Sequence, residues 1–215
     1  MGVRVISTVV TPAVGGYDLT TLDVVKDEMS ITGNAQDATL TRYIKAASAT
    51  ISQFCNRVFQ SETIKDEFWP DREPYAYQVA GAVPSLQLSR WPVTSVTGVT
   101  ENGIDLTVDV DFRVDKANGS LVRLDGLAYP CQWLAWPIVA TYTGGFAEIP
   151  GDVSDAAVRL VKARYLAKGR DPFLRSESIP DVRDVSYWIA TGADAGALPP
   201  DVSDILENYR QPVIA

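Results

Sequence analysis

Residues 139 to 171 run in the order strand, adjacent glycines and helix, which is an order that can form a phosphate-binding loop. Gly144 and Gly145 follow an alternating apolar run, and Asp152 opens a helical pattern. A loop of the G-x-x-x-x-G-K-[ST] type needs a lysine, and the stretch GGFAEIPGDV contains none. Glu148 and Asp152 also occupy the place of the anion, at the positive end of the helix dipole. The stretch therefore predicts a tight turn that leaves a sheet, followed by a helix capped by Asp152.

Other residue types that carry catalysis are scarce or wrongly spaced. The chain has no histidine, and so lacks the commonest general base and metal ligand. Three carboxylates are expected on one face of the predicted strand DVDFRVD: Asp109, Asp111 and Asp115. They do not form a calcium loop, because Arg113 and Val114 stand where that loop needs Asn or Asp and then Gly. No catalytic residue, metal site or cofactor is predicted, and the chain is expected not to be an enzyme.

Composition bounds the class of protein. The chain has 215 residues, a net charge of −8 and a pI of about 4.6, so as a whole it should repel nucleic acid. No apolar run approaches the ~20 residues that span a bilayer, and the N-terminus is a poor signal peptide. Two cysteines, of which Cys55 lies on an apolar helix face, are too few for a disulfide scaffold. We expect folding in the cytoplasm and no contact with a membrane.

One segment reverses the acidic balance. Its cations are Arg159, Lys162, Arg164, Lys168, Arg170 and Arg175, with Asp171 the one acid among them. Two interpretations stay open. Cations on the polar face and last turn of a helix are favoured by the helix dipole. Alternatively, Arg159, Lys162, Arg164, Lys168 and Arg170 form a patch that faces an acidic partner or passing DNA.

Helical periodicity appears in four places. Residues 20–31 predict a short helix with Thr20 or Thr21 as N-cap, and residues 37–59 repeat apolar side chains at i, i+3, i+4 and i+7 over more than four turns. A third helix follows Asp152 and ends near Gly169. A fourth begins in PPDVSDILENYR, with an apolar stripe.

Between the second and third helices the pattern changes to strands. Hairpin-type dipeptides separate the runs: Asn102-Gly103, Asn118-Gly119 and Asp125-Gly126. Such turns join antiparallel strands only, so an antiparallel meander is predicted.

The fold class predicted is α+β: a small helical bundle with an inserted antiparallel β subdomain and extended terminal arms. The predicted divisions are an N-terminal arm (1–19), a helical core (20–60 and 146–170), the β subdomain (61–145), a loop arm (171–198) and a C-terminal helix and tail (199–215).

Four segments in this order resemble the head–tail connector proteins of long-tailed phages and gene transfer agents, which act as head-completion adaptors. The opening, residues 19–59, resembles theirs at Leu22, Val25, Lys26, Leu40, Ile44, Ala47, Ile51, Arg57 and Phe59. The stretches WPVTSVTGVTENG and YTGGFAEIPGDVSDAAVRLVKARY are similar to their Pro-Val-x-x-Val segment and strand–turn–helix. LPPDVSDILENYRQPVIA is similar to the end of the longer members. The large β insertion departs from the short members.

The resemblance implies a structural adaptor of the virion neck. Such an adaptor forms a homo-oligomeric ring, a dodecamer, between the portal protein and the next head-completion or tail protein. The ring continues the DNA channel, and DNA passes without sequence-specific binding. A closed ring needs heterologous interfaces.

Two further contacts are expected under this resemblance. A C-terminal apolar stripe followed by a cation is the predicted portal-binding segment: Val202, Ile205, Leu206, Tyr209 and Arg210. Packing of that stripe on its own subunit is the alternative. The loop arm is expected to supply a tail-side contact through Ser176, Tyr187 and Trp188.

Two other classes of function stay open. A carboxylate-based hydrolase would need two carboxylates facing each other across a pocket. A monomeric β-rich binding module would need an exposed platform formed by Trp69, Trp91, Trp133 and Trp136.

Overall fold

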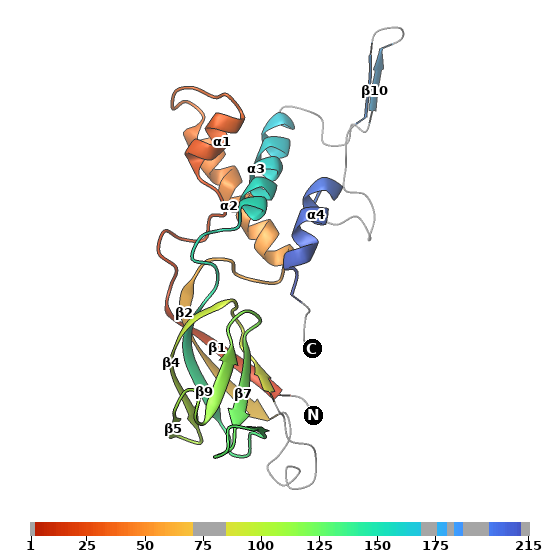
Figure 1. The fold of residues 1–215 in the computed structure, drawn as a ribbon. Helices are drawn as coiled ribbons and strands as arrows, with labels where there is room; N and C mark the ends of the chain where they lie inside the picture. The colour runs from red at the N-terminus through yellow and green to blue at the C-terminus, as the bar shows by residue number, and fades with distance from the viewer. Residues whose placement is uncertain (1–2, 71–84, 169–175, 180–182, 187–197, 212–215) are drawn as a thin grey trace. The chain divides into compact units, whose positions relative to one another are not determined.

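The computed structural model describes residues 3–70, 85–168, 176–179, 183–186 and 198–211. The chain divides into two compact units, coloured by position in Figure 1. The first, here called the β unit, comprises residues 1–16 and 60–148. The second, the helical unit, comprises residues 17–59 and 149–215. Together they confirm the α+β class.

The helical unit contains the four predicted helices. They are α1 (Leu22–Glu28), α2 (Asp37–Phe54), α3 (Gly151–Leu166) and α4 (Pro200–Leu206), the last continued by a 3-10 turn (Glu207–Tyr209). Thr21 is the N-cap of α1, and its hydroxyl accepts a hydrogen bond from the backbone amide of Val24 at 3.4 Å. α2 packs against α3, while α1 and α4 pack on this pair. The apolar face of α2 is buried as its periodicity predicts.

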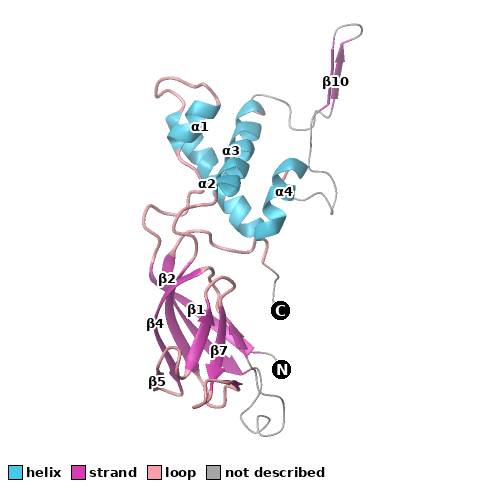
Figure 2. Ribbon diagram, viewed as in Figure 1, coloured by secondary structure: helices cyan, strands magenta, loops and turns pink. Residues whose placement is uncertain are grey.

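Nine strands lie among the described residues of the β unit. They are β1 (Val3–Thr11), β2 (Glu62–Pro70), β3 (Ser85–Gln87), β4 (Val93–Glu101), β5 (Ile104–Leu106), β6 (Phe112–Asp115), β7 (Ser120–Leu124), β8 (Pro130–Cys131) and β9 (Ile138–Gly144). Figure 2 colours the strands magenta and the helices cyan. All pairs of named strands in this unit are antiparallel.

The strands form two sheets, where the sequence predicted one meander. One sheet has the order β1-β2-β9-β4-β5, and the other has β3-β7-β6 with β8 paired to β7. β9 lies between β2 and β4, so it is a central strand and does not close an edge. Its side chains alternate between buried and half-buried. The core of the unit lies between the sheets and includes Phe68, Leu121, Trp133, Ile138 and Tyr142.

The three hairpin dipeptides each join strands that pair. Asn102 and Gly103 have φ of 49° and 79° between β4 and β5, and Gly119 has φ of 72° between β6 and β7. Positive φ at both central residues marks the turn whose twist suits a two-residue hairpin. Asp125-Gly126 lies between β7 and β8.

The predicted N-terminal arm is wrong in one respect. Residues 1–19 were expected to lack regular structure because of Pro12, Gly15 and Gly16. The structure places Val3–Thr11 in β1, paired along its length with β2. The run VRVISTVVT is rich in β-branched residues, which favour strands, and the breakers begin only where β1 ends.

Within the predicted loop arm the structure describes a hairpin, β10 (Ser176–Ile179) paired with β11 (Arg183–Ser186). No helix among the described residues has the length and apolar character to cross a membrane.

Candidate functional site

The glycines at the end of β9 are required by close backbone contacts. Gly145 has φ of 110°, and a Cβ there would lie 2.3 Å from the carbonyl oxygen of Gln60. A Cβ on Gly144 would lie 2.6 Å from the carbonyl oxygen of Arg90. The amide of Gly145 donates to the carbonyl of Pro92 at 2.9 Å. Both glycines therefore let three backbone segments meet where the sheet ends, as the prediction of an architectural turn requires.

Asp152 lies in the first turn of α3, but it is not the predicted N-cap. The N-cap is Pro150, and no side chain caps this helix. Asp152 accepts hydrogen bonds from its neighbour's amide, that of Val153, at 2.9 Å, and from the Tyr209 hydroxyl at 2.8 Å. Burial, and then the hydrogen bond to Asp152, raise the pKa of Tyr209. The protein's own carboxylate thus occupies the positive end of the α3 dipole.

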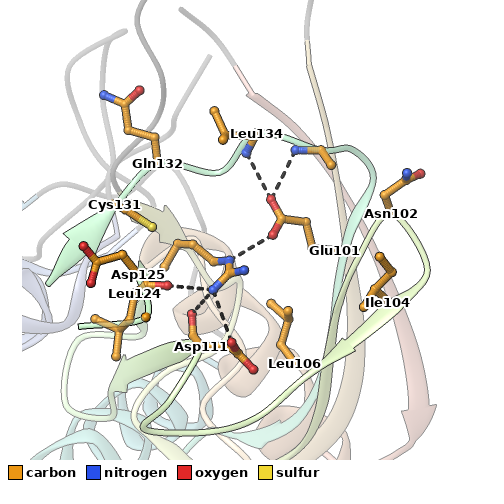
Figure 3. A pocket seen from close by; sticks show the side chains of 13 residues that line it. Glu101, Asn102, Ile104, Leu106, Asp111, Leu124, Asp125, Cys131, Gln132 and Leu134 are labelled. Atoms are coloured by element: carbon orange, nitrogen blue, oxygen red, sulfur yellow. Dashed lines mark hydrogen bonds and ion pairs between the residues drawn. The ribbon is translucent and has the colours of Figure 1, made fainter. Parts of the chain in front are cut away.

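The β unit has a pocket of about 350 Å³ beside β5 (Figure 3). Apolar side chains line part of it, among them Ile104, Leu106 and Leu134. The polar part is centred on Arg123, which donates to Glu101 at 2.9 Å and lies 3.8 Å from Asp111.

Glu101 is held as a structural carboxylate. Its other oxygen accepts from the amides of Leu134 and Ala135 at 3.0 and 3.1 Å. Burial acts to raise the pKa of Glu101, but the hydrogen bonds from Arg123 and from these two amides outweigh it, so the pKa is lowered. A general acid in a glycosidase pair needs a raised pKa. Glu101 therefore does not suit the role of general acid that the hydrolase alternative needs.

The aspartates of the DVDFRVD segment are divided among local roles and do not share a strand face. Asp109 precedes β6 with φ of 61° and pairs with Arg113 at 3.4 Å. Asp111 accepts from the amide of Thr107. Asp115 accepts from the turn that follows β6. No group of three or more His, Cys, Asp or Glu side chains that could hold a metal occurs among the described residues.

The tryptophans do not form an exposed platform. Trp133 is buried in the core, and Trp91 and Trp136 pack against it. Only Trp69, at 36% exposed, belongs to the surface among these four. The binding-module alternative loses the feature on which it rested.

The predicted portal-binding residues divide into two groups. Val202 and Leu206 are 1% and 0% exposed and belong to the core of the helical unit. The segment after them also contacts the helical unit, because the amide of Gln211 donates a hydrogen bond to the carbonyl of Cys55 at 2.9 Å. The alternative of packing on its own subunit therefore describes these two residues.

The other three residues of that set lie nearer the surface of the helical unit. Ile205 and Tyr209 are half-buried, and the Tyr209 ring packs against Phe59 in a tilted arrangement, with the ring centroids 5.9 Å apart. Arg210 is exposed; it lies over the Phe54 ring and pairs with Glu207 at 3.3 Å.

The described cations of the basic segment already have local partners, with one exception. Arg159 pairs with Asp155 at 2.8 Å and with Asp201 at 3.7 Å, and the hydrogen bond that it donates to Asp155 raises the pKa of Arg159. Lys162 pairs with Glu28 at 2.8 Å.

The remaining members of the basic segment differ in their surroundings. Arg164 donates to the Thr50 hydroxyl at 2.9 Å, and burial lowers its pKa. Lys168 is exposed, and Arg170 lies outside the described residues. These contacts favour the interpretation as a charged helix surface.

Most residues of the predicted tail-side contact lie outside the part of the chain that the structure describes. Tyr187 and Trp188 are not among the described residues, and Ser176 begins β10.

Sequence reasoning missed an exposed apolar surface on β1. Val5, Ile6, Val9 and Val10 are each between 38% and 56% exposed. The signal was present, because apolar residues occupy both the odd and the even positions of VRVISTVVT. A strand with one solvated face shows apolar side chains on the other face alone.

Comparison with solved structures finds the same fold in neck and virion assemblies. A chain in the structure "Neck of empty GTA particle computed with C6 symmetry" is 21% identical, with a TM-score of 0.52, covering 100% of this chain and 98% of its own. A chain of the virion of a native gene transfer agent (GTA) particle is 18% identical, with a TM-score of 0.54, covering 98% of this chain and 97% of its own. No curated protein matches.

The family comparison covers nearly the whole chain. The model of the head completion protein family matches residues 18–212, which include nearly all of the helical unit and residues 60–148 of the β unit, but not residues 1–16 with β1. The family is one of structural proteins, and the chain is accordingly not an enzyme. The chain belongs to the head completion protein family.

Proposed function

We propose that the chain is a structural adaptor of the virion neck that forms a ring between the portal and the tail-side proteins. The observation that carries the proposal is the family match over residues 18–212. The similarity of fold along 98% of a chain from a GTA neck supports the location. A dodecamer assembled in the host cytoplasm is the arrangement proposed.

The ring is proposed to continue the DNA channel without binding DNA specifically. The net charge of −8 supports this, since an acidic wall repels phosphates. The ion pairs of Arg159 and Lys162 support it too, because a cation already paired with a carboxylate attracts a phosphate less strongly.

The portal contact is proposed to use the exposed side of the C-terminal segment. Ile205 and Arg210 are the accessible members of the predicted set, while Val202 and Leu206 position them from the core. Deleting residues 199–215 would remove two buried side chains of the helical core, and would therefore disturb the fold as well as the contact. Surface substitutions are the appropriate test of this contact.

The tail-side contact remains proposed for residues 176–188, which include the β10–β11 hairpin.

Removing the gene in the native host tests the proposed function. We expect the deletion strain to accumulate heads without tails beside free tails, and a plasmid copy of the gene to restore tailed particles. Electron microscopy of lysates gives the three populations directly. Tailed particles at wild-type frequency in the deletion strain would rule out the proposed role. A strain lacking a tail gene is the control, since its heads should still contain the chain.

A further inference from the structure

We propose that copies of this chain join through the two opposite edges of the five-stranded sheet, with β1 of one copy added beside β5 of the next. The inference rests on the proposed ring and names the surfaces that close it. It commits to a second copy as the occupant of both edges.

Among the described residues, neither edge has a further strand partner. β1 and β5 are the first and last strands of the sheet order, so each pairs on one side only. Eight of the nine residues of β1 are exposed. A long edge strand with apolar side chains is a template for pairing with another chain, and proteins usually protect such edges with Lys, Pro or a bulge. β1 has one charged residue, Arg4, and no proline, and its register shift lies near its end, between Val9 and Thr11, away from Val5.

The two edges match in height along the strands. Ile104 of β5 pairs with Glu101, which pairs with Ile138. Ile138 pairs with Phe68, which pairs with Val5 of β1. Ile104 and Val5 therefore lie at the same height in the sheet and on the same face. The same route places Asp105 level with Ile6, on the opposite face. The four antiparallel steps from β1 to β5 leave these two strands running in the same direction. A neighbouring copy related by rotation about an axis along the strands therefore brings its β1 parallel to β5, at the same height.

Apolar side chains meet on one face of this junction. Val5 is 38% exposed and Ile104 is 68% exposed. Ile104 lines the pocket beside β5, whose rim includes Leu134 at 80% exposed. Val5 of the added strand would point to the same side as Ile104, and so toward the pocket of the neighbouring copy.

Opposite charges meet on the other face. Arg4 is exposed and forms no hydrogen bond or ion pair with any described residue, and the same is true of Asp105. Arg4 lies two residues from Ile6, the residue level with Asp105, which is about 7 Å along the strand. An arginine side chain spans that diagonal. Each copy thus brings an unpaired cation at one edge and an unpaired anion at the other.

The junction is heterologous, because it joins two different surfaces. Repetition of such a contact generates a ring when the rotation closes. β5 has three residues, so the stretch over which two copies pair is short. Two copies joined over so short a stretch need not form one continuous twisted sheet.

Disulfide trapping in assembled particles tests the junction. Neighbouring strands lie about 4.8 Å apart, within the roughly 4.4–6.8 Å Cα separation that a disulfide allows. Particles carrying Val5→Cys and Ile104→Cys are oxidised and run on non-reducing gels, with Cys131→Ser present because Cys131 lines the same pocket. We expect a ladder of covalent multimers. The matched control replaces Val5→Cys by Val9→Cys, on the same face but about 13 Å along the strand, and should remain monomeric.

The outcomes separate the junction from the proposed function. If particles contain many copies of the chain and the Val5–Ile104 pair stays monomeric, the junction is wrong and the adaptor role stands. If wild-type particles lack the chain, both fail.

Charge reversal gives a second test that does not depend on cysteine geometry. Arg4→Glu and Asp105→Arg should each lower the number of copies per particle by roughly fivefold, and the double reversal should restore it. Circular dichroism of the purified variants should match the wild type, since neither side chain has a described partner. Failure of the double reversal to restore incorporation would overturn the junction.

Discussion

Gly145 alone shows why the order of strand, glycines and helix serves the packing of the chain and does not form a phosphate-binding loop. Its positive φ and its contact with the Gln60 carbonyl leave no space for a side chain. A substitution there must move backbone rather than a flexible side chain. The requirement for glycine thus comes from the chain's own packing.

Gly145→Ala is expected to destabilise the protein by about 2 kcal/mol or more, because it combines a strained φ with a backbone clash. The matched control is Gly151→Ala at the start of α3, where a Cβ would meet nothing within 4 Å. The control should be neutral or slightly stabilising. Urea unfolding of the full chain measures both, and equal stabilities for the two variants would contradict the steric account.

Tyr142 anchors a buried polar network in the β unit. Its hydroxyl donates to Asp66 at 2.7 Å and accepts from the amide of Arg90 at 3.0 Å. Asp66 also accepts from the amide of Ser89 at 2.8 Å. Burial raises the pKa of Tyr142, and the charge of Asp66 raises it further.

This network predicts a loss of stability in alkali. The folded pKa of Tyr142 lies above its ordinary value of 10.0, so its contribution is complete below pH 10 and declines as pH rises toward the folded pKa. We expect the free energy of unfolding to fall by up to about 1.4 kcal/mol per pH unit above about pH 10. Tyr142→Phe should lack this component, which unfolding curves at pH 9, 10 and 11 resolve. Identical pH slopes in the two proteins would show that the hydroxyl is not buried.

At the residue scale the sequence predicted steric requirements better than positions of contact. The two adjacent glycines indicated a tight turn, as their close backbone contacts require. Asp152 was expected as the N-cap because Asp suits that position, but the helix starts earlier, and the carboxylate bonds to Tyr209 instead. That contact spans 57 residues, and local pattern carries no information on it.

At the scale of elements, α4 belongs to the helical unit. Its seven residues are too few for a stable isolated helix. Burial of Val202 and Leu206 supplies the missing stability, and the Cys55 thiol lies 3.8 Å from the carbonyl of Leu206. Burial also raises the pKa of Cys55 to about 11.

Leu206→Ala should destabilise the helical unit by about 2–5 kcal/mol, because it leaves a cavity at a fully buried site. Asn208→Ala, at an exposed neighbouring position, should change the free energy of unfolding by about 0.5 kcal/mol or less. Thermal unfolding followed at 222 nm reports the helices. A Leu206→Ala protein as stable as the control would mean that α4 packs elsewhere.

The outer side of the same segment carries the proposed portal contact. Arg210→Glu should leave the fold intact, since the side chain is 55% exposed, and should lower incorporation into portal-bearing heads. Arg159→Glu on α3 is the comparison, because it reverses an equally accessible cation that already has carboxylate partners. Copies per head are counted by quantitative mass spectrometry. Loss of incorporation with Arg159→Glu alone would transfer the portal contact to α3.

Most elements were predictable because their signals are local. The period of α2, the hairpin dipeptides and Thr21 as a cap each act within a few residues. The division of the strands into two sheets and the central place of β9 were not, because they depend on pairings between distant segments. β1 pairs with a strand that begins more than fifty residues later, after two helices.

At the scale of the whole molecule, two units of different class serve one structural role. The family match includes residues 60–148 of the β unit, so that part of the β unit belongs to the family's architecture, while β1 lies outside the match. Composition contributed the sign of the net charge, which disfavours tight binding of DNA by the chain as a whole. The candidate surfaces needed the structure, since exposure of β1 and burial of α4 are tertiary facts.

A cryo-electron-microscopy reconstruction of the neck of particles from the native host tests the central claim most directly. The account predicts that the chain fits density as a closed ring around the DNA channel, between the portal and the first tail-side protein. Particles with that position filled by other proteins, or with the chain present as a single copy off the axis, would contradict it.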